Sequence, residues 1–179
     1  EFSFNTILEN WPNTTKAIIF CSKGNNTGDG YLLAALLKEA GIQSQIVQIT
    51  KREGLSPATA KGLRVCKQRK VKTIKFSSFK KMKIEKNTVL IDALLGTGLK
   101  GKVRKELHQA IEFINKKSKN YPLLSLDIPS GICADSGTEL GASILADVTT
   151  TFVGRKRGCY TSKGKERAGK FYFNDLLVG

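Results

Sequence analysis

The sequence is poor in the residues that build zinc and nucleophile sites, because it has only one histidine and four cysteines. The cysteines stand at positions 21, 66, 133 and 159 without a Cys-x-x-Cys pair, and one histidine cannot complete a Cys/His zinc cluster. We expect the four thiols to be reduced and to fill small spaces in the core of a cytoplasmic protein. His108 falls inside a helical pattern, where we expect a surface or structural role.

Long apolar runs are also missing, since no stretch approaches the roughly 18 residues that a membrane span needs. The first residues lack the basic, apolar and small-residue succession of a secretory signal, and the chain begins at Glu1 without a methionine. We therefore expect no membrane partner and a chain that starts partway through a longer one. Its 179 residues suit one domain, residues 1–179.

Acidic residues are few, which leaves a net charge of +15. Residues 61–86 hold eleven Lys or Arg and a single acid, Glu85. This basic strip could bind phosphates or RNA, or it could be a solvated surface. We favour the solvated surface and expect no nucleic-acid partner, because the only aromatics are Phe76 and Phe79 and no RNA-binding signature accompanies them.

Apolar stretches alternate with helical patterns along the chain. Strands are expected at 16–21, 45–49, 74–76, 88–93, 123–126, 148–153 and 169–173, and helices at 31–40, 57–69 and 104–117. The strands are apolar on both faces, which is typical of a parallel sheet covered on both sides. The sequence thus predicts an α/β fold, a three-layer α/β/α sandwich with a Rossmann-like, mostly parallel sheet.

Residues 22–30 read as a polar, glycine-rich turn between the first strand and the first helix. Backbone N–H groups at such a place favour an anion such as a pyrophosphate. The stretch has neither the P-loop ending nor the dinucleotide spacing, so neither motif is present. The alternative is a tight turn with Asp29 as a helix N-cap, but Asn25 and Asn26 add more polar groups than a cap needs.

Two further strand ends carry acids. Asp92 ends an otherwise apolar strand, and Asp127 ends another, with Ser130 three residues later. Together with Asn26 they form an oxygen-only set that suits a hard cation rather than zinc or copper. The alternative for Asp92 is a buried carboxylate satisfied by neighbouring backbone N–H groups. Ser130 is not in a G-x-S-x-G elbow, so a serine nucleophile is not expected.

Four motifs occur in one order: GNNTGDG at 24–30, DALLGTGL at 92–99, LDIPSG at 126–131, and AD at 146–147 followed by T-F-x-G-x-K-x-G at 151–158. In this combination the sequence resembles the YjeF N-terminal domain family, whose members are NAD(P)H-hydrate epimerases. The resemblance implies interconversion of the R and S forms of NADHX and NADPHX, which are nicotinamide cofactors hydrated at C6. The other hypothesis is a non-catalytic RNA- or protein-binding scaffold on the same fold.

The resemblance also implies site residues. Asn26, Asp92 and Ser130 match the family's potassium ligands, so K⁺ is the expected cofactor. Inverting C6 requires proton transfer, for which Asp127 is the candidate. Lys156 could stabilise charge or bind phosphate, or it could be a surface lysine. The residues expected to contact substrate are Asn25, Asn26, Thr27, Gly28, Asp29, Gly96, Thr97, Gly98, Leu99, Lys100, Gly101, Lys102 and Asp127.

Some expectations concern what surrounds the domain. Thr27 stands where the family usually has glycine, so its side chain is expected where the backbone approaches the ligand. Family members usually carry further N-terminal helices, of which only a remnant is expected here. A homodimer and a fused or separate NAD(P)H-hydrate dehydratase are the expected protein partners.

Overall fold

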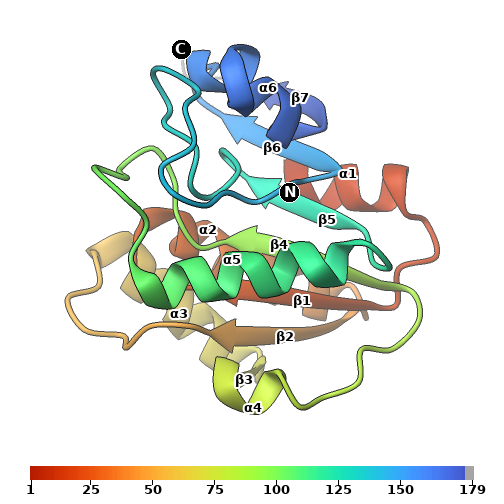
Figure 1. The fold of residues 1–179 in the computed structure, drawn as a ribbon. Coiled ribbons are helices and arrows are strands. Elements are labelled where there is room, and N and C mark those ends of the chain that lie inside the picture. The colour runs from red at the N-terminus through yellow and green to blue at the C-terminus, as the bar shows by residue number, and fades with distance from the viewer. Residues whose placement is uncertain (176–179) are drawn as a thin grey trace.

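The computed structural model describes residues 1–175, and within them a seven-stranded sheet forms the centre of the molecule (Figure 1). The strand order is β3-β2-β1-β4-β5-β6-β7, and all six neighbouring pairs are parallel. The strands are β1 (Lys16–Cys21), β2 (Gln43–Gln48), β3 (Lys72–Lys75), β4 (Thr88–Ala93), β5 (Leu123–Leu126), β6 (Val148–Phe152) and β7 (Lys170–Asn174).

Helices cover both faces of the sheet, which confirms the three-layer sandwich. One apolar cluster joins the sheet to α1, α2 and α3, and a second joins its other face to α4 and α5. Figure 1 shows α5 crossing the sheet in front, with α2 and α3 behind it. The helices are α1 (Phe2–Asn10), α2 (Asn25–Glu39), α3 (Pro57–Gln68), α4 (Phe76–Phe79), α5 (Lys105–Ser118), the 3₁₀ turn η1 (Arg157–Tyr160) and α6 (Ser162–Ala168).

The expected strand at 74–76 is placed differently in the structure. β3 covers Lys72–Lys75, and Phe76 begins the short helix α4 instead of ending the strand. The ring of Phe76 lies 5.4 Å, centroid to centroid, from Phe113 of α5 in an edge-to-face contact. This contact with α5, on the face of the sheet that α4 and α5 cover, explains why the chain turns at Phe76.

The prediction that the first helix begins at residue 31 was wrong, because α2 begins at Asn25. Gly28 and Gly30 therefore lie inside a helix. They permit close packing there and are not part of a loop. A Cβ on Gly30 would stand 2.5 Å from the Cβ of Ala93, and one on Gly28 would stand 3.1 Å from the Cα of Thr59. The glycines let α2 approach β4 and α3 more closely than a side chain would allow.

Helix α1 is attached to the sheet at strand β6. Ile7 is fully buried in the cluster that contains α2 and α3. The hydroxyl of Ser3 is hydrogen-bonded to that of Thr150 in β6, at 2.8 Å and across 147 residues of sequence. Helix α1 is thus an integral part of the described fold.

The strand order reverses direction between β1 and β4, since the chain moves outward to β3 and then returns to the other side of β1. In open parallel sheets, ligands bind beyond the carboxyl ends of the strands at such a reversal. All of the polar motifs named above follow strands that end on this side. Among residues 1–175, no helix is both long and apolar enough to cross a membrane.

Candidate functional site

A cleft of about 860 Å³ opens at the reversal point. Its walls come from the turn between β1 and α2, the loop after β4, the segment leading into α5, and the residues after β2. Such a volume is in the range of small-molecule and cofactor sites. Asp127, at the end of β5, completes the lining.

Most of the expected substrate-binding residues line this cleft. They are Asn25, Asn26, Asp29, Gly96, Thr97, Gly98, Leu99, Lys100, Lys102 and Asp127. Thr27, Gly28 and Gly101 are not among the lining residues in the described part of the chain.

Thr27 does not stand in the way of a ligand, contrary to the expectation from its place in the motif. Its side chain is completely buried, and its hydroxyl donates to the carbonyl of Ala93 at 2.8 Å. The same oxygen accepts a hydrogen bond from the backbone N–H of Ser22, also at 2.8 Å. Thr27 therefore ties the start of α2 to the ends of β1 and β4 from beneath the cleft.

Asp92 and Ser130 meet in a buried cluster under the cleft. The Ser130 hydroxyl donates to Asp92 Oδ1 at 2.6 Å, and the Ser130 N–H donates to Oδ2 at 2.9 Å. The Leu94 N–H and the Ser125 hydroxyl add further hydrogen bonds to the carboxylate. Burial raises the pKa of Asp92, and these hydrogen bonds oppose that shift.

Asn26 reaches the same cluster from α2. Its side-chain amide donates to the carbonyl of Leu95 at 2.9 Å, and the hydroxyl of Ser130 lies 3.2 Å from that carbonyl oxygen. The Oδ1 atom of Asn26 is buried and has no hydrogen-bond donor among the described residues. An unsatisfied buried acceptor is costly, so a hydrogen-bond donor or a cation at this point would stabilise it.

A hard cation fits the donor set around Asn26. The groups gathered here are amide, hydroxyl, carboxylate and carbonyl oxygens, and the described residues contain no cluster of three or more His, Cys, Asp or Glu that could hold a metal. Oxygen donors with a single formal charge suit a cation of low charge density better than a transition metal.

Asp127 and Lys156 form an ion pair at the opposite end of the cleft from β2. The Nζ of Lys156 lies 3.0 Å from Oδ1 of Asp127, and each side chain is only 17% exposed. Lys156 also donates to the carbonyls of Phe152 and Gly154, at 2.8 and 2.9 Å. Lys156 is therefore not a free surface lysine, and its head group is held at a carboxylate that lines the cleft.

The backbone at Asp127 is unusual. Its φ is +66°, a left-handed conformation that is uncommon outside glycine. The Asp127 N–H donates to the Thr150 carbonyl at 2.7 Å, and the Thr151 hydroxyl donates to Oδ1 at 3.2 Å. Contacts from β6 therefore maintain the turn that aims this carboxylate into the cleft.

Asp29 lies on the first turns of α2 and also faces the cleft. It does not cap the helix, because the capping position belongs to Gly24. Loss of hydration against the surrounding protein raises the pKa of Asp29 to about 6, with a further contribution from the negative charge of Asp127. The cleft thus contains a carboxyl group that ionises at a higher pH than an ordinary aspartate.

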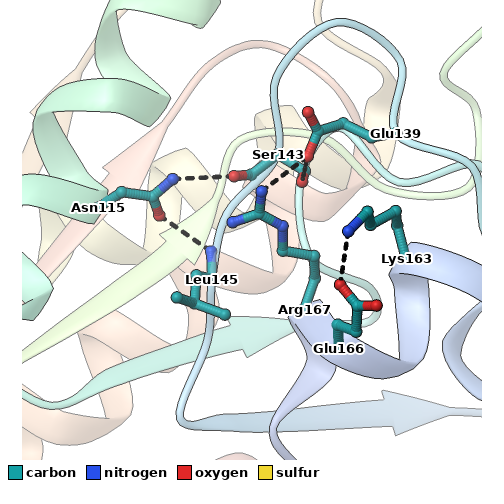
Figure 2. Close-up of polar contacts among 7 residues, drawn as sticks. All are labelled: Asn115, Glu139, Ser143, Leu145, Lys163, Glu166 and Arg167. Atoms are coloured by element: carbon teal, nitrogen blue, oxygen red, sulfur yellow. Dashed lines mark hydrogen bonds and ion pairs between the residues drawn. The ribbon is translucent and has the colours of Figure 1, made fainter.

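An extended segment, residues 139–145, braces the loop that carries Ser130; we call it the strap. Asn115 of α5 holds it at two points, donating to the carbonyl of Ser143 and accepting from the N–H of Leu145, each at 2.9 Å (Figure 2). Between them, the N–H of Ile144 donates to the carbonyl of Ser130 at 2.9 Å. The strap therefore positions the backbone of Ser130 beside Asp92.

The strap is also attached to α6. Arg167 pairs with Glu139 at 3.0 Å, and Glu139 accepts a hydrogen bond from the hydroxyl of Ser143 (Figure 2). A Cβ on Gly131 would stand 1.9 Å from the carbonyl oxygen of Ala142, so the strap lies directly on this turn. No periodicity in the sequence predicts the strap, although a glycine directly after Ser130 is a signal of close backbone approach.

Sequence reasoning also missed cationic side chains around the cleft. Lys23, Lys51 and Arg104 line it together with Lys100 and Lys102. The position of Lys23 just after β1 and of Lys51 just after β2 was a usable signal, since both follow strand ends. Among the remaining candidates, His108 lies on α5 outside the cleft, with its Nε2 3.5 Å from Glu112 Oε1.

The family relationship is now clear. Residues 2–158 match the family described as YjeF-related protein N-terminus. The chain belongs to this family.

Within this YjeF-related domain, all four cysteines are unpaired, and Cys21, Cys66 and Cys159 are buried, as expected of small core residues.

Named relatives of this YjeF-related domain extend over nearly its whole length. It is 35% identical over 176 residues to the bifunctional NAD(P)H-hydrate repair enzyme Nnr of Coxiella burnetii, covering 98% of this chain and 35% of that protein. It is 31% identical to the NAD(P)H-hydrate epimerase of Levilactobacillus brevis, covering 98% and 79%. The chain thus spans about a third of the length of the bifunctional relative.

A solved structure has the same fold. The crystal structure of yeast ynu0 superposes on this YjeF-related domain with a TM-score of 0.82 at 20% sequence identity, covering 98% of this chain and 76% of the yeast chain. At this identity the likeness establishes the arrangement of the sheet and helices alone.

Proposed function

We propose that the chain is an NAD(P)H-hydrate epimerase, an isomerase that interconverts the R and S forms of NADHX and NADPHX. The observation that carries this proposal is the ion pair that Lys156 forms with Asp127, a carboxylate in the wall of the cleft. The names of the relatives from Coxiella burnetii and Levilactobacillus brevis support the substrate class.

The reaction needs one proton donor and one proton acceptor close to each other. At C6 of the hydrated ring, the C–O bond breaks when the hydroxyl takes a proton and leaves as water. The ring nitrogen supplies an electron pair, and a C6=N1 iminium forms. Water then returns to C6 from the other face and loses a proton. No oxidant or reductant takes part, so a pair of acid and base groups is sufficient.

Lys156 and Asp127 can supply both roles. The ammonium of Lys156 donates the proton that leaves with the hydroxyl, and the carboxylate of Asp127 accepts the proton of the returning water. The separation of 3.0 Å between Nζ and Oδ1 then lets the proton pass from Asp127 to Lys156. This transfer restores the starting ion pair, so neither residue needs bulk solvent to complete the cycle.

The rest of the cleft suits a dinucleotide. Helix α2, fifteen residues long, begins at Asn25, and its first N–H groups lie at the cleft between the ends of β1 and β4. A helix N-terminus favours a pyrophosphate at this position. Lys100, Lys102 and Arg104, which also line the cleft, add attraction for these phosphate groups.

Potassium is the proposed resident ion. Asn26, Asp92 and Ser130 would hold it, and the unsatisfied Oδ1 of Asn26 is the observation that favours a cation there. When bound, K⁺ supplies a fixed positive charge under the phosphate-binding part of the cleft. The protein's own part is to keep these oxygens in place, through α2, β4 and the strap.

The test of the proposed function is conversion of purified (R)-NADHX and (R)-NADPHX to their S forms, followed by chromatography. The spontaneous rate is measured in parallel, because these compounds also epimerise without enzyme. We expect conversion well above that background, and its loss in Asp127→Asn. Conversion at the background rate by the folded parent protein would contradict the proposal.

The proposal extends to partners and location. Because relatives from Coxiella burnetii and Escherichia coli are named bifunctional repair enzymes, we propose that a dehydratase, fused or separate, works beside this domain. A homodimer and a cytoplasmic location belong to the same proposal, and the four unpaired cysteines favour that location.

A further inference from the structure

The end of the cleft beside β2 contains polar and charged residues that take no part in the proposed epimerisation. In dinucleotide-binding sheets of this strand order, the adenosine ribose lies beyond the carboxyl end of the second strand. An acid there accepts a hydrogen bond from the ribose 2′-hydroxyl, whereas a basic side chain accommodates a 2′-phosphate. The residues after β2 therefore report on which nucleotide is preferred.

The first four residues after β2 contain no acid. They are Ile49, Thr50, Lys51 and Arg52. Thr50 and Lys51 line the cleft, and Lys23, which follows β1, lines it too. Two ammonium groups thus line the side of the cleft next to β1 and β2, where we expect the adenosine ribose.

Arg52 and Gln48 are occupied elsewhere. The Arg52 guanidinium donates to Gln48 Oε1 at 2.9 Å and to the hydroxyl of Thr73 at 3.2 Å, and it lies 5.6 Å from the ring centroid of Tyr31. Gln48 Oε1 also accepts from the hydroxyl of Tyr31 at 2.8 Å. This network fixes the end of β2 and leaves Lys51 as the basic residue of the segment that faces the cleft.

Lys51 makes only a weak ion pair, and the Thr50 hydroxyl makes no hydrogen bond among the described residues. The side chain of Lys51 is 87% exposed, and its contact with Glu53 is long, at 3.9 Å. The hydroxyl oxygen of Thr50 is buried without a hydrogen-bond partner among the described residues. Since that oxygen is covered by protein, the exposed ammonium of Lys51 is the group of this segment that can contact a ligand.

Glu53, directly after Arg52, is an acid that also lines the cleft. Its side chain is 79% exposed and faces the ammonium of Lys51. A phosphate placed between Lys51 and Lys23 would be repelled by Glu53, so the acid reduces the preference that the lysines create. The two opposite charges give the experiment two variants with opposite expected effects.

We propose that Lys51, together with Lys23, binds the 2′-phosphate of the adenosine ribose and makes the domain prefer the phosphorylated dinucleotide, NADPHX, over NADHX. This inference rests on the proposed function for the identity of the substrate. The 2′-phosphate contact itself requires only that an ADP-ribose unit occupies the cleft, so it can be measured without any turnover.

The experiment compares binding of ADP-ribose and 2′-phospho-ADP-ribose, which differ only in the phosphate, by calorimetry. We expect the phosphorylated compound to bind about tenfold more tightly to the parent chain, the usual worth of one charged contact. Lys51→Ala should remove most of this ratio without changing the affinity for ADP-ribose, and Glu53→Gln should increase it. Lys67→Ala, on α3 outside the cleft, is the matched loss of charge and should leave the ratio unchanged.

Equal affinities of the parent chain for the two compounds would overturn the inference. So would a loss of the same size for both compounds in Lys51→Ala, because Lys51 would then contact the pyrophosphate. If Glu53→Gln weakened ADP-ribose, Glu53 would be the partner of the 2′-hydroxyl and the preference would be the reverse. Absence of epimerisation together with the expected affinity ratio would contradict the proposed function and leave this assignment standing.

Discussion

The Nζ of Lys156 and the Oδ1 of Asp127 lie 3.0 Å apart, although the two residues are 29 positions apart in the sequence and follow different strands. Asp127 follows β5, and Lys156 follows β6, so the parallel pairing of these two strands creates the contact. The pair is an ion pair in the resting protein, and in the proposed mechanism it is also a route for a proton. Ion pairing and proton transfer by this pair can be separated by mutation.

Asp127→Asn should lower turnover by about 10²- to 10⁴-fold, the usual worth of a positioned acid or base, because the amide keeps the shape but cannot accept the proton. The melting temperature should fall as well, because the largely buried ammonium of Lys156 loses its counter-charge. Rates are measured at saturating substrate above the spontaneous background. Ser130→Ala is the comparison, and it should weaken binding more than chemistry. Turnover near the parent value in Asp127→Asn would make Lys156 alone the residue to test.

Replacing potassium by sodium should weaken ADP-ribose binding by the parent chain, because the oxygens around Asn26 would lose the ion that we propose there. Asn26→Ala should bind the ligand less tightly in potassium and should show no difference between the two salts. Thermal shift and calorimetry at equal ionic strength measure both effects. A parent chain whose affinity is the same in both salts would show that the unsatisfied oxygen of Asn26 serves another purpose.

Asp29 should make stability depend on pH. Its pKa is raised to about 6 from an ordinary 3.8, so ionisation costs more in the folded chain than in the unfolded one. The contribution of Asp29 to stability therefore falls as pH rises from about 4 to about 6 and stays low above that. Asp29→Asn should raise the melting temperature at pH 7.5 and leave it unchanged at pH 3.5. A benefit that is equal at both pH values would mean that ionisation is not the cause.

The glycine at position 30 should be indispensable for packing. Gly30→Ala places a Cβ 2.5 Å from the Cβ of Ala93, and neither backbone can move without disturbing the sheet. We expect destabilisation of about 1–3 kcal/mol, the usual cost of overpacking. Gly98→Ala is the control, because its Cβ would meet nothing within 4 Å. Denaturant unfolding of the two variants measures the difference.

The central strands could be predicted because their signal is local. The bounds of β1, β4 and β5 are those that the apolar runs predict, and acids at strand ends located Asp92 and Asp127 correctly on one edge of the sheet. The start of α2 could not be predicted in this way. Gly28 and Gly30 have poor helix propensity, and only the close approach of Thr59 and Ala93 explains them.

Other parts of the site depend on contacts distant in sequence. Nothing near Asn115 indicates that its amide holds Ser143 and Leu145, some thirty residues away. Likewise, the local sequence at Lys156 fits a surface lysine as well as a partner of Asp127. Such pairings become visible only when the order of the strands is known.

The basic strip, residues 61–86, should bind RNA only weakly. Its eleven cationic side chains are exposed on α3, on β3 and in the segments that follow α3 and α4. Non-specific phosphate contacts of this kind lose affinity steeply with salt. We expect binding to single-stranded RNA to vanish at physiological salt in a titration. Sub-micromolar affinity at that salt, lost when Lys70, Lys72 and Lys75 are neutralised, would favour an RNA-associated scaffold.

The hydrogen bond between Ser3 and Thr150 affects the order in which the chain folds. It joins the first helix to the sixth strand across 147 residues. On the ribosome, α1 emerges well before residue 150, so this contact cannot form until most of the domain has been made. Closing so long a loop is also a late and slow step in solution. Refolding experiments should therefore find helix α1 among the last elements to gain protection from hydrogen exchange.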